Sequence, residues 1–191
     1  MNFDAIIKKR RSVKSFTGKL SDWKPVLHAI DASIQGPFAG NHNNLKFLIV
    51  EEKKKIDVIA ELCEQSWISE STLLVIVCSD DTHLENLYGS RGRVYSRQQA
   101  GAAIQTLWFK LIEYGLDTCW VGAYSDELIK EKLKIPQHVQ IEAILPIGYA
   151  KGKAPKKSKL NLDEALFWEN WGSPRRPSVF EESVEEIRPT S

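Results

Sequence analysis

The feature of this sequence that most constrains its fold is an unbroken apolar run from Leu73 to Cys78. A strand with one solvated face alternates apolar and polar residues, whereas this run contains no polar position. It is also far too short to cross a bilayer, which takes about 20 residues in a helix. We therefore expect this run to form a strand that is buried on both faces.

Helical and extended patterns flank this run on both sides. The clearest helix is predicted at 96–114, where apolar and small residues recur at helical spacing, and a polar, irregular stretch is expected before it at 80–94. Because the elements do not follow a strict βαβ rhythm, the expected fold class is α+β. Other helices are predicted at 3–9, 23–33, 53–65, 126–135 and 163–171, and other strands at 45–50, 118–124 and 141–149.

Length and charge narrow the class of protein. The chain has 191 residues and a formal net charge of +1. That length suits one domain, which we place at 1–172, followed by a polar tail at 173–191. Nonspecific nucleic-acid binding needs a strong excess of Lys and Arg, so we expect no nucleic-acid partner. The N-terminus lacks an apolar core of signal-peptide length and the three cysteines form no disulfide pattern, which together predict a cytoplasmic protein with no membrane association.

Several common catalytic motifs are absent. The sequence contains no GxGxxG after a predicted strand, no GxxxxGK[ST], no HExxH and no GxSxG. Its four histidines, at 28, 42, 83 and 138, are scattered. We therefore expect no metal site and no hydrolytic triad, and we assign no catalytic residue.

A basic segment, Arg10-Arg11-Ser12-Val13-Lys14, follows the first predicted helix. If it is extended, Arg10, Ser12 and Lys14 share one face, since side chains alternate along an extended chain. A guanidinium, a hydroxyl and an ammonium group on one face suit a phosphate. Taken alone, a solvated surface that continues Lys8-Lys9 is the more ordinary interpretation, and a nuclear-localisation signal is another.

Three further segments combine binding groups with an ordinary structural explanation. The loop at 36–44 offers glycines and amide side chains to a ligand, or it is a plain turn. The segment at 115–123 ends in a small Gly-Ala pair that would let a flat ring lie against backbone, or it is a core strand with a bulge. Lys157 and Lys159 share one side of an extended stretch, or they belong to a solvated linker.

In their order along the chain, these segments resemble the nitroreductase family of FMN enzymes. The order is an Arg-Arg-Ser-x-Lys-x-Phe start, a Gly-Pro-x-Ala-x-Asn loop before a strand, Arg-Gly-Arg before an Ala-rich helix, Gly-Leu-x-Thr-Cys-Trp-Val-Gly-Ala, Pro-Ile-Gly-Tyr and a final Lys-x-Lys. The resemblance spans residues 3–172, nearly the whole chain.

The resemblance implies a mixed sheet flanked by helices in a homodimer, with FMN at the dimer interface. The tail from Leu160 onward would be exchanged with the partner, which would explain Phe167, Trp168 and Trp171 in an otherwise polar stretch. The residues implied for the phosphate and ribityl end of FMN are Arg10, Arg11, Ser12, Lys14, Lys157 and Lys159. Those implied for the ring are Trp120, Val121, Gly122 and Ala123, with Asn41 and Asn43 contributed by the other subunit.

The implied activity is electron transfer from NAD(P)H, through FMN, to a small organic acceptor such as a nitroaromatic compound or a quinone. We expect Phe38, Tyr88 and Arg91 around the substrate. The sequence departs from the family pattern at Asn43-Asn44-Leu45, where Gln-Pro-Trp is usual, and at Phe38, Gln99 and Thr106. Two alternatives stay open: a related dehalogenating enzyme with a lid at 84–95, and a flavin-storage protein without turnover.

Overall fold

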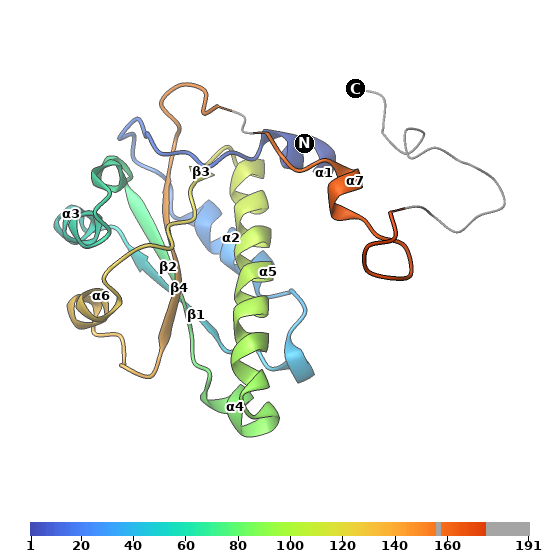
Figure 1. Cartoon of the computed structure of the whole chain (residues 1–191). Coiled ribbons are helices and arrows are strands. Elements are labelled where there is room, and N and C mark those ends of the chain that lie inside the picture. The colour runs from blue at the N-terminus through green and yellow to red at the C-terminus, as the bar shows by residue number, and fades with distance from the viewer. Residues whose placement is uncertain (156–157, 175–191) are drawn as a thin grey trace. The chain divides into compact units, whose positions relative to one another are not determined.

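The computed structural model describes residues 1–155 and 158–174. The chain divides after Pro155 into two units. The first is built on a four-stranded antiparallel sheet with the strand order β1-β2-β4-β3 (Figure 1). Its strands are β1 (Leu45–Val50), β2 (Leu73–Ser79), β3 (Asp117–Thr118) and β4 (Gln140–Gly148).

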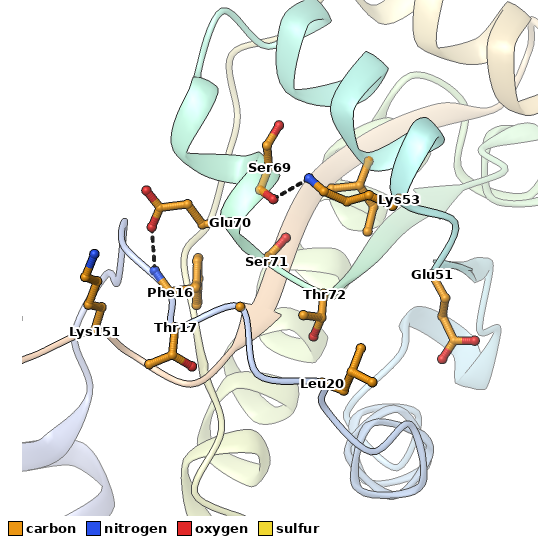
Figure 2. A pocket seen from close by; sticks show the side chains of 12 residues that line it. Phe16, Thr17, Leu20, Glu51, Lys53, Ser69, Glu70, Ser71, Thr72 and Lys151 are labelled. Carbon is orange, nitrogen blue, oxygen red and sulfur yellow. Dashed lines mark hydrogen bonds between the residues drawn. The ribbon is translucent and has the colours of Figure 1, made fainter.

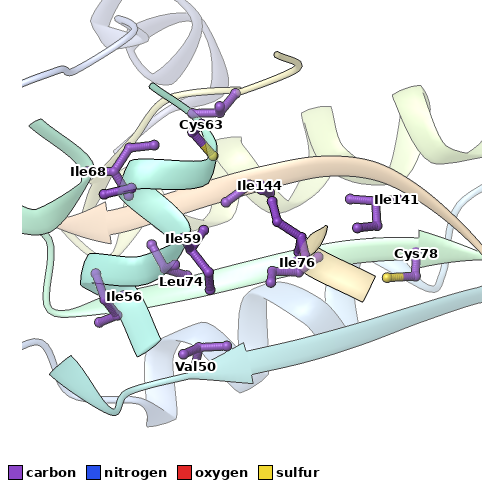
Figure 3. Close-up of a cluster of buried hydrophobic side chains, with 13 residues drawn as sticks. Val50, Ile56, Ile59, Cys63, Ile68, Leu74, Ile76, Cys78, Ile141 and Ile144 are labelled. Carbon is purple, nitrogen blue, oxygen red and sulfur yellow. The ribbon is translucent and has the colours of Figure 1, made fainter. Parts of the chain in front are cut away.

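Helices cover both faces of this sheet. They are α3 (Lys53–Leu62) and α6 (Asp126–Leu133) on one face, and α2 (Lys24–Ser33) and α5 (Arg91–Glu113) on the other (Figure 1). Along β2, Leu74 and Ile76 point into the core beneath α3 and α6 (Figure 3), whereas Leu73, Val75 and Val77 pack against α2 and α5. Every residue of β2 is buried. The prediction of a strand buried on both faces is therefore confirmed, as is the α+β class.

The long helix begins earlier than its sequence pattern predicts. The stretch expected to be irregular at 80–94 instead contains α4 (Thr82–Tyr88) and the start of α5 at Arg91. The two helices meet at Gly92, where a Cβ atom would lie only 2.3 Å from the carbonyl oxygen of Leu84. This close approach of α5 to α4 thus requires glycine. The sequence of α4 is mostly polar, and for that reason its helix was not predicted from apolar spacing.

Three other boundaries differ from the predictions. The strand expected at 118–124 is limited to the two residues of β3, followed by a single bridge from Val121 to Ile144. The helix α3 ends at Leu62, and a short 3-10 helix, Ser66–Glu70, follows it. In the second unit, the helix expected at 163–171 is the single turn α7 (Leu162–Ala165).

The N-terminal segment continues the sheet beyond β3. After α1 (Phe3–Lys9), the Val13 amide donates to the Thr118 carbonyl oxygen at 3.1 Å, and Phe16 forms an antiparallel bridge with Ala150. Val13 and Phe16 are both buried, so they fasten this segment to the first unit. No helix in the described part of the chain is long and apolar enough to cross a membrane.

An ion cluster joins α5 to one end of the sheet. The register shifts between Val77 and Cys78, so that Glu142 is the extra residue of a bulge in β4. Arg97 contacts Glu142 (Nε to Oε1, 2.8 Å) and Asp81 (Nη2 to Oδ1, 2.5 Å), and both carboxylates are largely buried. Burial raises the pKa of Glu142, while a Ser79 hydrogen bond and the Arg97 charge oppose that rise.

Replacing Arg97 by alanine should lower the free energy of unfolding by about 1–3 kcal/mol, because two carboxylates then lose their cation. This loss is smaller than that for a fully buried ion pair because Arg97 is partly exposed. Without Arg97 the pKa of Glu142 rises further above its unfolded value. The folded state then binds the proton more tightly, so stability falls as pH rises and the deficit should be larger at neutral pH than near about pH 5. Urea unfolding at both pH values measures this.

The matched control is Arg93→Ala in the same helix. Arg93 pairs with Glu85 at an exposed site, and such surface pairs contribute about 1 kcal/mol or less. Equal losses for the two variants, or an Arg97→Ala deficit that does not change with pH, would contradict the assignment.

Candidate functional site

The structure places the basic segment beside the segment expected to line a flavin ring. The hydrogen bond from Val13 to Thr118 fixes their relative position, and Cys119 follows at once. Burial raises the pKa of the Cys119 thiol, and the charge of Lys14, a hydrogen bond with Ser12 and the charge of Arg10 oppose that rise. The three side chains predicted for one face therefore lie near enough to Cys119 to act on its thiol.

Two aromatic rings hold the basic side chains in place. The Arg10 guanidinium lies 5.1 Å from the ring centre of Trp108, and the Lys14 ammonium lies 5.6 Å from that of Trp67. Arg11 turns back instead, and its Nη1 donates to the carbonyl oxygens of Lys8 and Arg10 at 2.7 Å. The basic segment is therefore ordered by contacts of its own, rather than simply solvated.

The segment from Trp120 to Ala123 presents backbone rather than side chains. Val121 is buried, and its amide and carbonyl groups both bond to Ile144. Gly122 and Ala123 are exposed, and their amides have no acceptor among the described residues. Trp120, with 41% of its surface exposed, stands beside them. Two free amides next to an exposed aromatic ring can bind the polar edge of a flat heterocycle.

The loop at 36–44 is held to α5 by a side chain whose role the sequence did not reveal. Gln99 accepts a hydrogen bond from the Ala39 amide at 2.7 Å and donates to Asn44 Oδ1 at 3.0 Å and to the His42 carbonyl oxygen at 3.3 Å. The buried Asn44 also donates to Ser96 Oγ. The sequence signal that could have identified this anchor is the polar pair Ser96 and Gln99, three residues apart on the buried face of α5.

The predicted loop residues lie in this anchored conformation. Asn41 is exposed and has a positive φ of 62°, which asparagine tolerates better than most residues. Asn43 is exposed, and its Oδ1 accepts from the Leu45 amide at 2.9 Å at the start of β1. Phe38 is half-buried in a small cluster with Leu45, Ala100 and Ala103.

The remaining substrate candidates lie where α4 meets α5. Tyr88 packs edge-to-face on Tyr95 with ring centres 5.3 Å apart, and the Arg91 guanidinium lies 5.6 Å from the same ring. The Tyr88 hydroxyl also borders Gly40, where a Cβ atom would be 2.5 Å from it. These residues therefore adjoin the loop at 36–44.

The predicted residues thus form two groups on one chain. The loop group is anchored at Ser96 and Gln99, whereas Arg10 of the basic group stacks on Trp108. Nine helical residues separate Gln99 from Trp108, which corresponds to about 13 Å along the axis of α5. A single chain does not bring Asn41 and Arg10 together.

The C-terminal lysines stay a prediction. Lys157 lies outside the described residues, and Lys159 is an exposed residue of the second unit. In that unit the tilted rings of Phe167 and Trp171 contact each other with centres 5.0 Å apart, and 93% of the Trp171 surface is exposed.

A cleft of about 530 Å³ lies elsewhere on the first unit, and none of the predicted flavin residues lines it (Figure 2). Some of its charged side chains already have partners within the protein. The Lys53 ammonium donates to Asp57 and to the Ser69 carbonyl oxygen, and Glu70 accepts from the Phe16 amide at 2.9 Å. This cleft is therefore not the candidate flavin site.

The cysteines provide no nucleophile for the site. All three are buried, and burial raises the pKa of Cys63 and of Cys78 to about 11. Their thiols therefore stay protonated at neutral pH and pack as small apolar groups.

The structure is an α+β protein with an antiparallel sheet between two helical layers. Its candidate site places a basic segment beside free backbone amides. The chain belongs to the nitroreductase family, since residues 7–149 match the sequence pattern of that family.

Individual relatives agree with this membership. The "Putative NADH dehydrogenase/NAD(P)H nitroreductase" of Methanothermobacter thermautotrophicus is 26% identical over 170 residues, which cover 86% of this chain and 85% of the relative. The iodotyrosine deiodinase of Thermotoga neapolitana is 23% identical over 167 residues, covering 79% of this chain and 90% of that protein.

Solved structures share the fold. A nitroreductase family protein from Clostridium novyi NT superposes with a TM-score of 0.73 at 29% identity, covering 91% of this chain and 96% of that one. An FMN-dependent nitroreductase from Clostridium difficile R20291 superposes with a TM-score of 0.74 at 20% identity, covering 88% of this chain and 100% of that one.

Replacing Gln99 by alanine should release the loop at 36–44, because the Ala39 amide loses its acceptor and the buried Asn44 loses a donor. A buried group left unpaired costs about 1–3 kcal/mol. Hydrogen exchange should then accelerate at Ala39 and its neighbours in the loop. The control is Gln98→Ala, since Gln98 is exposed and its side chain has no hydrogen bond among the described residues. Similar exchange rates in the two variants would refute the anchoring role.

Proposed function

We propose that this protein is an FMN-dependent oxidoreductase that transfers electrons from NAD(P)H to a small organic acceptor, such as a nitroaromatic compound or a quinone. It acts in two half-reactions, as a cytoplasmic homodimer. The observation that carries the proposal is the hydrogen bond that joins the basic segment to β3, the strand that the free amides of Gly122 and Ala123 follow.

The residues present suit the two ends of FMN. Arg10, Ser12 and Lys14 gather around Cys119 and offer two positive charges and a hydroxyl to a phosphate. Contacts between a cation and a ring are worth about 0.5–2 kcal/mol, whereas hydrogen bonds to a charged group are worth about 1.5–3 kcal/mol. Both basic side chains can therefore leave their rings for a phosphate at no net loss.

The other end of the site would hold the ring. The free amides of Gly122 and Ala123 donate to acceptor atoms on its edge, and Trp120 lies against it or against the acceptor. Bound FMN supplies the hydride and electron transfer itself, so the protein contributes orientation and electrostatics. No side chain of this chain is required to move a proton in our proposal.

The separation of the two groups along α5 supports the proposal of a homodimer. Because the loop and the basic segment contact different levels of that helix, Asn41 and Asn43 reach a flavin held by Arg10 only if they come from a second copy. Lys157, Lys159 and the exposed aromatics of the second unit would add to the same interface.

The names of the relatives support the chemistry of this proposal. One solved relative is named as FMN-dependent, and one curated relative is named for NADH and NAD(P)H. These names favour the cofactor and the electron donor. Membership of the nitroreductase family supports the proposed class of acceptor.

The purified protein should be yellow, with about one FMN per chain. Anaerobic NADH or NADPH should bleach the flavin absorbance, and a nitroaromatic compound or a quinone should restore it. Visible spectroscopy measures all three steps. Protein that stays colourless after addition of FMN would overturn the proposal, and bound flavin that neither nucleotide bleaches would favour flavin storage instead.

Replacing Lys14 by alanine should weaken FMN binding by roughly 10–150-fold, the equivalent of one lost charge-assisted contact. Quenching of flavin fluorescence on titration measures the affinity, and thermal melting monitors the fold. The matched control is Lys19→Ala, which removes a lysine that also lies over a ring, that of Tyr149, but outside the basic segment. Equal affinities in the two variants would remove Lys14 from the site.

A second candidate activity is reductive dehalogenation, which the deiodinase relative favours. The stretch at 84–95, where a lid was expected, consists of the end of α4 and the start of α5, with Arg91 available to an anionic substrate. Both candidates use the same flavin site. Iodide release from iodotyrosine, assayed beside nitro reduction with the same reduced protein, separates them.

A further inference from the structure

Two histidines that are 41 residues apart in the sequence lie against each other on the surface of the first unit. His42 follows the loop's short 3-10 helix, and His83 lies in the first turn of α4. The distance from His42 Nδ1 to His83 Nε2 is 3.2 Å, and the ring centres are 4.5 Å apart. Both residues are exposed.

This distance suits two ligands of one metal ion. In a tetrahedral zinc site, Zn–N bonds of about 2.0–2.1 Å place neighbouring nitrogen ligands about 3.3–3.4 Å apart. The rings must turn so that both lone pairs face one ion, but the separation of the two nitrogens is already within about 0.1–0.2 Å of that spacing.

The backbone holds both rings in this arrangement. The His42 amide donates to the Ala39 carbonyl oxygen, and the His42 carbonyl oxygen accepts from Gln99. The two segments are also joined directly, because the Asp80 amide donates to the Asn44 carbonyl oxygen and the Asn44 side chain donates to the Asp80 carbonyl oxygen. Such pre-organisation favours chelation, because little freedom remains to be lost on binding.

We propose that His42 and His83 form a two-histidine site for a borderline divalent transition-metal ion of the Zn²⁺ class. Imidazole suits this class, whereas Mg²⁺ and Ca²⁺ prefer oxygen ligands. In the pair, one imidazole donates its N–H to the other. On binding, the donating ring adopts the tautomer with its proton on its outer nitrogen, so both inner nitrogens offer a lone pair. Water fills the remaining positions of the ion.

Other potential ligands do not compete strongly. Burial raises the pKa of Cys63 and Cys78 to about 11, so their thiols are poor ligands at neutral pH. His138 lies 3.5 Å from an Asp80 carboxylate oxygen. Within the described residues, no group of three or more His, Cys, Asp or Glu side chains is placed to hold a metal ion. The scattered histidines led us to expect no metal site, and the tertiary contact between His42 and His83 is the ground on which we propose one.

The site would tie the loop that carries Asn41 and Asn43 to α4. A bound ion would therefore stiffen the region next to Tyr88 and Arg91, while its open positions face solvent. The inference rests on the histidine geometry alone and does not depend on the flavin.

Calorimetric titration of the purified full-length protein, treated first with a chelator, with ZnCl₂ tests the proposal. We expect one Zn²⁺ per chain, no binding of Mg²⁺, and a rise in melting temperature with Zn²⁺. His42→Asn and His83→Asn should each weaken Zn²⁺ binding by at least about tenfold, whereas His138→Asn should not. Because both histidines are exposed, the variants should retain the wild-type circular dichroism spectrum; His83→Gln repeats the test with a second side chain.

Loss of Zn²⁺ binding in both single variants, with His138→Asn unchanged, supports the site. Absence of Zn²⁺ binding to the wild-type protein, or equal binding to His42→Asn, overturns it. Neither result bears on flavin binding, which the visible spectrum reports separately.

Discussion

The rest of the structure depends on the burial of β2 and β4 between two layers of helices. A central strand without a polar residue must be covered on both faces, since each exposed apolar side chain would forfeit about 1.5–3 kcal/mol. The alternate residues of β2 therefore specify two separate cores, and each core selects the helices that complete it. Once α2 and α5 cover one face, the segments attached to α5 have fixed positions.

The helix α5 then acts as a scaffold about 34 Å long. Arg97 fastens it to the sheet, Gln99 holds the loop that precedes β1, and Trp108 receives Arg10. The loop at 36–44 and Arg10 come from distant parts of the sequence, yet both contact this one helix. That arrangement explains why a short basic segment and an amide-rich loop, each ordinary alone, acquire defined positions.

Periodicity was enough to predict the elements that bury one continuous apolar pattern. The run at 73–78 and the spacing within 96–114 led directly to β2 and to most of α5. Sequence failed where a tertiary contact decides the structure. Gly92 is needed because α4 lies close to the start of α5, and Gln99 matters because a loop folds onto it. Likewise, no spacing rule relates His42 to His83.

The pairing of Val13 and Phe16 with the β3 side of the sheet has a consequence beyond ligand binding. An unpaired strand at the margin of a sheet offers free amides and carbonyls to any other extended chain, which is a route to aggregation. The segment with the candidate phosphate ligands covers part of that margin. The residues proposed for phosphate binding therefore lie in the segment that also shields this margin, so that loss of the segment would expose backbone groups of the sheet.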